Sequence, residues 1–275
     1  MIAANLELNY SLVEKILVNF FKEEYKKVGF SKAVFGLSGG VDSALVAYIA
    51  AKALGPENVT GVLLPYKKSS KASVDHAMLV VNALGINHEI IDISEMADAY
   101  IKLDKGISKL RMGNVMSRCR MIVLYDFSVK LNALVAGTSN KTELLLGYGT
   151  QFGDMASAVN AIGDLYKVQV WDLSRHMGVP IEIIEKPPTA DLWEDQTDES
   201  ELGFSYKNVD ELLYLLIDKR YDRDMLIEAG FADEFVDKVI KKIQLNQYKR
   251  KLPTIAKISG RSIPHDFRYA RDWGF

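Results

Sequence analysis

The sequence predicts an α/β fold in which a doubly wound parallel sheet is flanked by helices and followed by a helical C-terminal part. Short apolar runs alternate with helical runs through the first half of the chain, and a glycine-rich turn follows the first of these apolar runs. From about residue 209 the periodicity is helical only. Because strands that alternate with helices imply βαβ crossovers, the sheet should be parallel and covered on both faces.

The individual elements follow from periodicity and from glycine and proline punctuation. Leu12, Ile16 and Phe20 recur at helical spacing and predict a first helix over residues 11–28. Apolar runs predict strands at 33–37, 59–64, 88–93 and 132–136. Helical runs separate them at 42–54, 73–84 and 114–130, whereas residues 94–112 have a mixed pattern.

The second half of the chain contains two segments of unusual composition. Residues 186–208 are rich in Pro, Asp, Glu and Gly, which predicts a long loop over the site. Residues 209–247 return to a helical pattern, and residues 249–275 predict an irregular tail that wraps over a surface. We expect residues 1–275 to form a single domain, since this length suits one α/β unit with a large core.

The most informative segment is residues 35–43, Phe-Gly-Leu-Ser-Gly-Gly-Val-Asp-Ser, which lies between a predicted strand and a predicted helix. A helix start carries unpaired N–H donors and a partial positive charge, which suit a phosphate. Gly39 and Gly40 allow the backbone to approach the anion closely, and the hydroxyls of Ser38 and Ser43 are further donors. The alternative is a glycine turn that joins a strand to a helix and binds nothing.

Two other phosphate-binding loops are excluded. The segment contains neither the Gly-Lys-Ser/Thr ending of a Walker loop nor the Gly-x-Gly-x-x-Gly turn of dinucleotide-binding folds. Since ligands of open α/β sheets bind beyond the carboxyl ends of the strands, the loops after residues 37, 64 and 136 should face one common site.

Two acidic residues are candidates for a magnesium site. Asp42 lies in the glycine-rich segment 35–43, which we call the phosphate loop, and Glu143 follows the fourth predicted strand. Two carboxylates, phosphate oxygens and waters form a normal magnesium coordination sphere. Glu143 also fits a second interpretation, in which it is an acid placed at a helix N-terminus by the helix dipole.

Further segments have two interpretations each. Residues 147–154 are glycine-rich, which fits a lid over bound nucleotide or a flexible connection. Lys167 lies at a predicted helix start, which fits either a residue that neutralises phosphate charge or a solvated surface charge. Arg118 and Arg120 lie two residues apart on a helix and should point in different directions, one toward an anion and the other toward a local partner. Cys119 between them fits a packing residue.

Composition narrows the class of protein. Lys and Arg number 34 and Asp and Glu 36, for a net charge of −2, which argues against a nucleic acid bound through its phosphates. Cys119 is the single cysteine, and a cytoplasmic location is therefore expected. No apolar run approaches the roughly 18 residues that span a bilayer, so we expect no membrane association.

The segment Ser-Gly-Gly-x-Asp-Ser resembles the signature of the ATP pyrophosphatases, which cleave ATP between the α and β phosphates. Over nearly the whole chain the similarity is to NAD synthetases in their stand-alone, ammonia-dependent form. It includes Leu64-Pro65-Tyr66, Asn114-Val115, the run from Gly137 to Glu143, and Gly163-Asp164-Leu165-Tyr166-Lys167. It continues through Pro188-Thr189-Ala190-Asp191-Leu192, Asp198-Glu199 and Lys249-Arg250.

The resemblance implies an adenine nucleotide alpha hydrolase-like fold and a set of site residues. ATP would contact Gly36, Leu37, Ser38, Gly39, Gly40, Val41, Asp42, Ser43, Thr138, Lys167 and Thr189. Mg²⁺ would bind Asp42 and Glu143, which with Lys167 would be the catalytic residues. Deamido-NAD⁺ would contact Arg118, Gln151, Asp154 and Lys249, at the interface of a homodimer.

The reaction that the resemblance implies is amidation of deamido-NAD⁺ to NAD⁺, with ammonia as nitrogen donor, ATP as co-substrate and Mg²⁺ as cofactor. An adenylate of the dinucleotide would form first, and AMP and diphosphate would be released. The alternatives are another adenylating ATP pyrophosphatase, either an amidase or a tRNA-modifying enzyme, and a nucleotide-binding module without turnover.

Overall fold

Four parallel strands form the sheet of the computed structural model, which describes residues 6–189, 197–251 and 253–262. The strands are β1 (Ala33–Gly36), β2 (Val59–Leu63), β3 (Asn87–Ile90) and β4 (Leu134–Val135), and their order is β3-β2-β1-β4. Ala33 of β1 therefore pairs with β2 on one side and with β4 on the other. The chain moves outward from β1 to β3 and then returns to place β4 beside β1. This reversal creates a crevice where β1 and β4 end, the usual ligand position in such sheets.

Helices cover both faces of the sheet, as predicted. On one face α1 (Tyr10–Lys27), α2 (Val41–Leu54), α3 (Lys71–Leu84) and α7 (Lys167–Met177) pack over apolar side chains that include Phe35 and Leu63. On the other face α4 (Ser94–Ile101) and α5 (Lys109–Leu131) pack over a set that includes Val34 and Val62. Neighbouring residues of a strand point to opposite faces, so Val34 and Phe35 belong to different cores.

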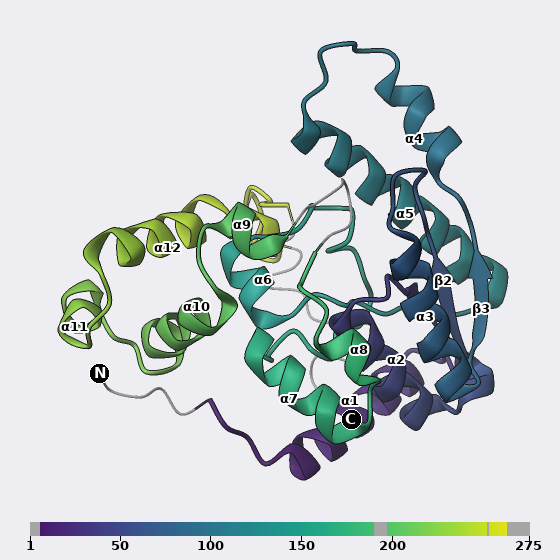
Figure 1. Cartoon of the computed structure of the whole chain (residues 1–275), viewed down its shortest axis with the longest axis horizontal. Coiled ribbons are helices and arrows are strands. Elements are labelled where there is room, and N and C mark those ends of the chain that lie inside the picture. Colours follow the sequence, from purple (N-terminus) through teal and green to yellow (C-terminus); the bar gives the residue numbers. More distant parts are fainter. Residues whose placement is uncertain (1–5, 190–196, 252, 263–275) are drawn as a thin grey trace.

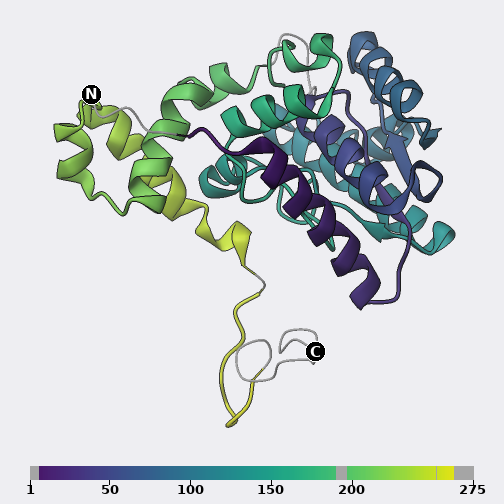
Figure 2. The same cartoon turned by 90° about the horizontal axis from the view of Figure 1, so that it is seen from below.

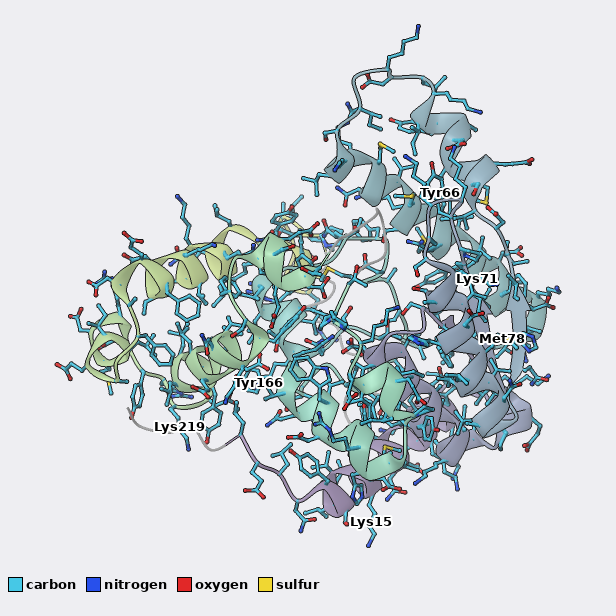
Figure 3. The ribbon with its side chains drawn as sticks, viewed as in Figure 1. Lys15, Tyr66, Lys71, Met78, Tyr166 and Lys219 are labelled. Carbon is cyan, nitrogen blue, oxygen red and sulfur yellow. The ribbon has the colours of Figure 1, made fainter. Side chains whose placement is uncertain are left out.

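A third apolar core belongs to the helical C-terminal part (Figure 1). Its helices are α9 (Asp198–Leu202), α10 (Tyr206–Leu213), the π-helical turn η2 (Tyr214–Asp218), α11 (Arg223–Glu228) and α12 (Asp233–Leu245). In Figure 1 they lie across the molecule from the sheet, with α6 (Lys141–Leu146) and α7 between. Leu146 of α6 and Tyr166, which Figure 3 labels beside these helices, are buried in this core. The helical part is thus packed directly on the elements that follow β4.

Several predicted boundaries were wrong, and the strand expected at 132–136 spans only Leu134–Val135. The helix expected at 114–130 begins at Lys109, because the Ser108 hydroxyl caps it by accepting a hydrogen bond from the Arg111 N–H at 3.3 Å. The strand expected at 88–93 spans Asn87–Ile90. The loop expected at 186–208 contains α9 and the start of α10, where Thr197 and Ser205 provide the N-caps. A five-residue helix is too short to show a period in sequence; residues 190–196 lie outside the described part.

The tail differs from the prediction in part. The tail begins with a short 3₁₀ helix, η3 (Gln247–Arg250). Two further short elements occur earlier in the chain: the 3₁₀ helix η1 (Pro56–Asn58) and the single α-helical turn α8 (Ile181–Ile184). Residues 253–262 have no helix or strand, and Figure 2 shows them running away from the helical body. The expectation that the tail wraps over a surface is therefore wrong for these residues, whose Ile258 is 96% exposed. Residues 263–275 lie outside the described part. Across the described ranges, no helix combines the length and apolarity needed to cross a bilayer.

Candidate active site

A cavity of about 620 Å³ opens at the carboxyl ends of the strands. Its walls include Leu37 after β1, Leu64 after β2 and Thr138 after β4, which confirms that these three loops face one site. All the site residues expected from the sequence line this cavity with the exception of Gly39. Those residues are Gly36, Leu37, Ser38, Gly40, Val41, Asp42, Ser43, Arg118, Thr138, Glu143, Gln151, Asp154, Lys167, Thr189 and Lys249.

The phosphate loop is held by its own two serines. The Ser38 and Ser43 hydroxyls lie 3.1 Å apart, and the Ser43 hydroxyl donates to the Gly40 carbonyl at 3.0 Å. The Gly40 N–H donates to the Ser38 hydroxyl at 3.3 Å. Gly40 is the N-cap of α2 and supplies no side-chain cap, so the first turn of this helix presents its N–H groups to the cavity.

Gly39 lies where the phosphate loop packs closely against α3. Its φ of +76° is unfavourable for residues with a side chain. A Cβ at this position would lie 2.2 Å from the Ser73 carbonyl oxygen on α3. Gly39 is therefore buried against α3 and is not among the described residues that line the cavity.

Lys167 lies between the two acidic residues. Its ammonium forms an ion pair with Asp42 Oδ2, and Glu143 Oε1 lies 3.6 Å from the same Nζ. Lys167 is the first residue of α7 and is only 2% exposed, so the interpretation as a solvated surface charge is wrong. Asp42 and Glu143 come from the starts of two other helices, α2 and α6. Three helix starts thus converge on one charged group of the cavity wall.

The structure confirms Glu143 as an acid at a helix N-terminus. Glu143 Oε2 accepts a hydrogen bond from the Asn140 N–H at 3.2 Å, and the Asn140 side chain accepts one from the Glu143 N–H, so the pair forms a capping box. The other oxygen, Oε1, faces Lys167. The capping contact therefore fixes the carboxylate and leaves one oxygen directed at the cavity.

Burial and neighbouring charges change the proton affinity of these groups. Burial, together with repulsion from Asp42, raises the pKa of Glu143 to about 8, although Lys167 acts in the opposite sense. Burial by itself lowers the pKa of Lys167, but the carboxylates of Asp42 and Glu143 outweigh it and raise that pKa above its ordinary value. The lysine is therefore held as a cation, which gives the wall a fixed positive charge.

The two carboxylates fit a magnesium ion. Mg²⁺ prefers oxygen ligands and is usually bound by one or two carboxylates together with phosphates and water. Asp42 and Glu143 supply two carboxylates that line the cavity and both lie beside the Lys167 ammonium. Within residues 6–189, 197–251 and 253–262, no cluster of three or more His, Cys, Asp or Glu side chains is arranged to bind a metal alone.

The glycine-rich segment 147–154 forms another part of the cavity wall. The Asp154 carboxylate accepts hydrogen bonds from the Ser117 hydroxyl at 2.7 Å and from the Thr150 N–H at 2.8 Å. Lys249 donates to the Gly147 and Gly149 carbonyls at 2.7 and 2.9 Å. These contacts tie the segment to α5 and to η3.

Arg118 and Arg120 reach different parts of the cavity, which confirms that they point in different directions. Arg118 donates to the Gln151 carbonyl at 3.2 Å, whereas Arg120 donates to the Leu64 carbonyl after β2 at 3.0 Å. Cys119 between them is buried in the core beneath α5, and burial raises the pKa of its thiol. Cys119 is thus a packing residue, as predicted.

Two site residues were not assigned a role from the sequence. Asn140 is fully buried and donates through Nδ2 to Asp42 Oδ1 at 2.9 Å. Asp198 on α9 lines the cavity and accepts hydrogen bonds from the hydroxyls of Tyr148 and Tyr206 at 3.1 and 3.0 Å. The Asn-x-x-Glu spacing signals a capping box, but a contact across 98 residues leaves no local pattern.

The parallel sheet, the glycine-rich loop at the start of α2 and the lysine between two acids define the class of protein: an α/β nucleotide-binding protein with the adenine nucleotide alpha hydrolase-like fold. A family model described as NAD synthase matches residues 13–253. An NH₃-dependent NAD⁺ synthetase of Chlorobium phaeobacteroides (strain BS1) is 58% identical over 268 residues, which cover 98% of this chain and 97% of that protein. The chain belongs to the NAD synthase family.

Two solved structures are similar in fold. The NH₃-dependent NAD synthetase of Campylobacter jejuni, determined with a nitrate ion, is 34% identical, with a TM-score of 0.78 over 91% of this chain and all of that chain. The NMN synthetase of Francisella tularensis is 28% identical, with a TM-score of 0.82 over 92% of this chain and all of that chain.

Proposed function

We propose that this chain converts deamido-NAD⁺ to NAD⁺ with ammonia as nitrogen donor, and that ATP is cleaved to AMP and diphosphate. Membership of the NAD synthase family and the 58% identity to an NH₃-dependent NAD⁺ synthetase support this reaction. The single structural observation that carries it is the buried Lys167 ammonium between Asp42 and Glu143, beside an uncapped helix start.

The chemistry requires an anion to attack a polyanion. The nicotinate carboxylate forms a bond to the α-phosphorus of ATP while the bond to diphosphate breaks, and ammonia then displaces AMP from the mixed anhydride. Like charges repel strongly where water is excluded, so the site must neutralise the phosphates. The N–H groups of α2, the hydroxyls of Ser38 and Ser43 and the Lys167 ammonium provide that neutralisation.

Asp42 and Glu143 would hold Mg²⁺, which supplies further positive charge to the phosphates and the leaving diphosphate. Asn140 and the capping box hold the two carboxylates in place without a metal. Thr138 and Thr189 on the cavity wall would contact the same nucleotide. In this arrangement the protein positions charge and contributes no nucleophile of its own.

The dinucleotide would bind at the wall formed by Arg118, Gln151, Asp154 and Lys249.

We also propose that the chain forms a homodimer through the face of α5. Three apolar side chains on one face of this helix are exposed, namely Ile122, Tyr125 and Val129, which are three and four residues apart. Contiguous exposed apolar surface is typical of protein interfaces, and α5 also carries Arg118. Light scattering should give a mass twice that of the chain, and Val129→Asp should reduce it.

The test of the reaction is a product assay. Purified chain is incubated with ATP, Mg²⁺, deamido-NAD⁺ and ammonium, and AMP and NAD⁺ should form in equal amounts. A parallel assay replaces deamido-NAD⁺ with the acid precursor of NMN, because an NMN synthetase is among the similar structures. A faster reaction with that precursor, or efficient use of glutamine in place of ammonium, would contradict the proposal.

This assay also separates the alternatives. Another adenylating enzyme would release diphosphate only with a different acceptor, and a binding module would release neither AMP nor NAD⁺. A cytoplasmic location and the lack of a nucleic-acid partner remain predictions from the sequence. That residues 1–275 act as a single domain is proposed because the cavity is lined by the sheet, by α5 and by Asp198 of the helical part.

A further inference from the structure

Asp210 is a fully buried acid of α10 that binds the starts of two other helices. Its Oδ1 accepts a hydrogen bond from the Thr142 hydroxyl at 2.5 Å, and its Oδ2 accepts one from the Val168 N–H at 2.9 Å. Thr142 belongs to the first turn of α6 and Val168 to the first turn of α7. One carboxylate thus joins three helices that are far apart in sequence.

Thr142 closes the connection between α6 and α7. Its hydroxyl oxygen accepts a hydrogen bond from the Lys167 N–H at 3.1 Å, and the same hydroxyl donates a hydrogen bond to Asp210. The backbone of Lys167 is therefore bound to the residue directly before Glu143. Neither Thr142 nor Asp210 is among the described residues that line the cavity.

These contacts place the two charged groups relative to each other. Thr142 and Asp210 fix where α6 and α7 begin, and those helix starts carry Glu143 Oε1 and Lys167 Nζ, which lie 3.6 Å apart. We propose that Asp210, acting through Thr142, is a positioning residue for Lys167 and Glu143 in the proposed amidation, on which this inference rests.

The chemistry of the contact supports a role in placement. A buried carboxylate is costly unless its oxygens are hydrogen-bonded, and here both are. It faces the N-terminus of α7, where the helix dipole favours negative charge. A second acid, Asp218 in η2, binds Lys141 and Tyr166 beside the same two helix starts but is 36% exposed. Because water screens that outer contact, the buried Asp210 is the stronger constraint.

The test compares Asp210→Asn, Thr142→Val, the double variant and Thr142→Ser. An amide has one acceptor oxygen, so Asp210→Asn loses one of the two contacts, and Thr142→Val removes the hydroxyl at nearly constant volume. We expect kcat to fall at least about tenfold in each single variant, because small misplacement of reacting groups is costly, while KM for both nucleotides changes less than about threefold. The double variant should lose far less than the product of the two losses, since both act through one connection. Thr142→Ser keeps the hydroxyl and should restore kcat to within about threefold of native.

Asp222→Ala is the matched control. Asp222 belongs to the same helical part and caps α11 by accepting a hydrogen bond from the Met225 N–H at 2.9 Å. It should lower the melting temperature and leave kcat unchanged.

The inference is overturned if Asp210→Asn lowers the melting temperature but keeps kcat within about twofold, if the two losses multiply, or if Thr142→Ser is as impaired as Thr142→Val. If Asp210→Asn does not fold, the comparison of kcat between Thr142→Val and Thr142→Ser tests the inference. A native chain that makes no NAD⁺ refutes the proposed function itself, whereas active variants of an active native chain refute this inference alone.

Discussion

Asn140 Nδ2 lies 2.9 Å from Asp42 Oδ1, so the amide that caps α6 also orients the acid of the phosphate loop. The same side chain accepts the Glu143 N–H through its Oδ1 at 2.9 Å. One buried amide therefore sets the positions of both proposed magnesium ligands. An aspartate here would keep the capping oxygen but lose the donor.

Asn140→Asp should accordingly impair both folding and turnover. It places a third carboxylate against Asp42, and a lost hydrogen bond to a charged group costs about 1.5–3 kcal/mol. We expect a lower melting temperature and a fall in kcat of at least about tenfold. Thermal unfolding and steady-state kinetics measure these, and native kcat at saturating Mg²⁺ would show that the amide does not orient Asp42.

Asp42→Asn and Glu143→Gln should lower turnover, because each change removes a proposed metal ligand. Asp42→Asn also removes the ion-pair partner of the buried Lys167, so its free energy of unfolding should fall by about 3–5 kcal/mol. Glu143→Gln relieves the repulsion from Asp42 and should cost less stability. We expect kcat to fall at least about a hundredfold. Asp172→Asn on the exposed side of α7 is the control and should change neither quantity by much. Near-native NAD⁺ synthesis by Asp42→Asn would refute the metal assignment.

Two adjacent glycines should respond differently to alanine. In Gly39→Ala the new Cβ meets the Ser73 carbonyl, so stability should fall by several kcal/mol. In Gly40→Ala the nearest atom is Ser38 Oγ at 3.4 Å, so the fold should persist while KM for ATP rises. Gly29→Ala has a similar positive φ but open space, and should cost only about 1 kcal/mol. Chemical denaturation of the three variants separates steric clash from backbone strain.

Arg118→Ala should raise KM for deamido-NAD⁺ about tenfold and leave KM for ATP unchanged, because a lost contact to an anionic group costs about 1–3 kcal/mol. Arg118 lines the cavity and donates to the Gln151 carbonyl. Arg120→Ala, at the Leu64 wall of the same cavity, is the control and should not raise KM for the dinucleotide selectively. Equal effects of both variants on both substrates would contradict the assignment of Arg118.

The stability of the protein should depend on pH through Asp210. Burial raises the pKa of Asp210 from its ordinary 3.8 to about 7, even though Thr142, Val168 and the Lys167 ammonium act in the opposite sense. Between these values the folded chain keeps a proton on Asp210 that the unfolded chain releases. The contribution of Asp210 to stability therefore falls by at most about 4 kcal/mol as pH rises from about 4 to about 7, and it is constant above that. Asp210→Asn does not titrate and should lack this decline. Denaturant unfolding at pH 5 and 7.5 compares the two, and equal pH dependence would show that Asp210 ionises normally.

Much of the fold follows from local patterns. The alternation of apolar strands with helices predicted the parallel sheet and both helical layers, because periodicity is a property of neighbouring residues. The phosphate loop was recognisable for the same reason, since strand, glycine turn and helix follow each other directly. The short helix α9 was not predicted, because five residues show no period.

The sequence alone predicted that Asp42 and Glu143 would lie at the carboxyl edge of one sheet, since their loops follow parallel strands. It left Lys167 with two interpretations. Only the tertiary structure decided that Lys167 is buried between the two acids and that Asn140 and Asp210 hold them. Hydrogen bonds between residues 40 to 100 positions apart depend on how whole helices pack. That packing arises from cores spread over the entire chain, and no short segment encodes it.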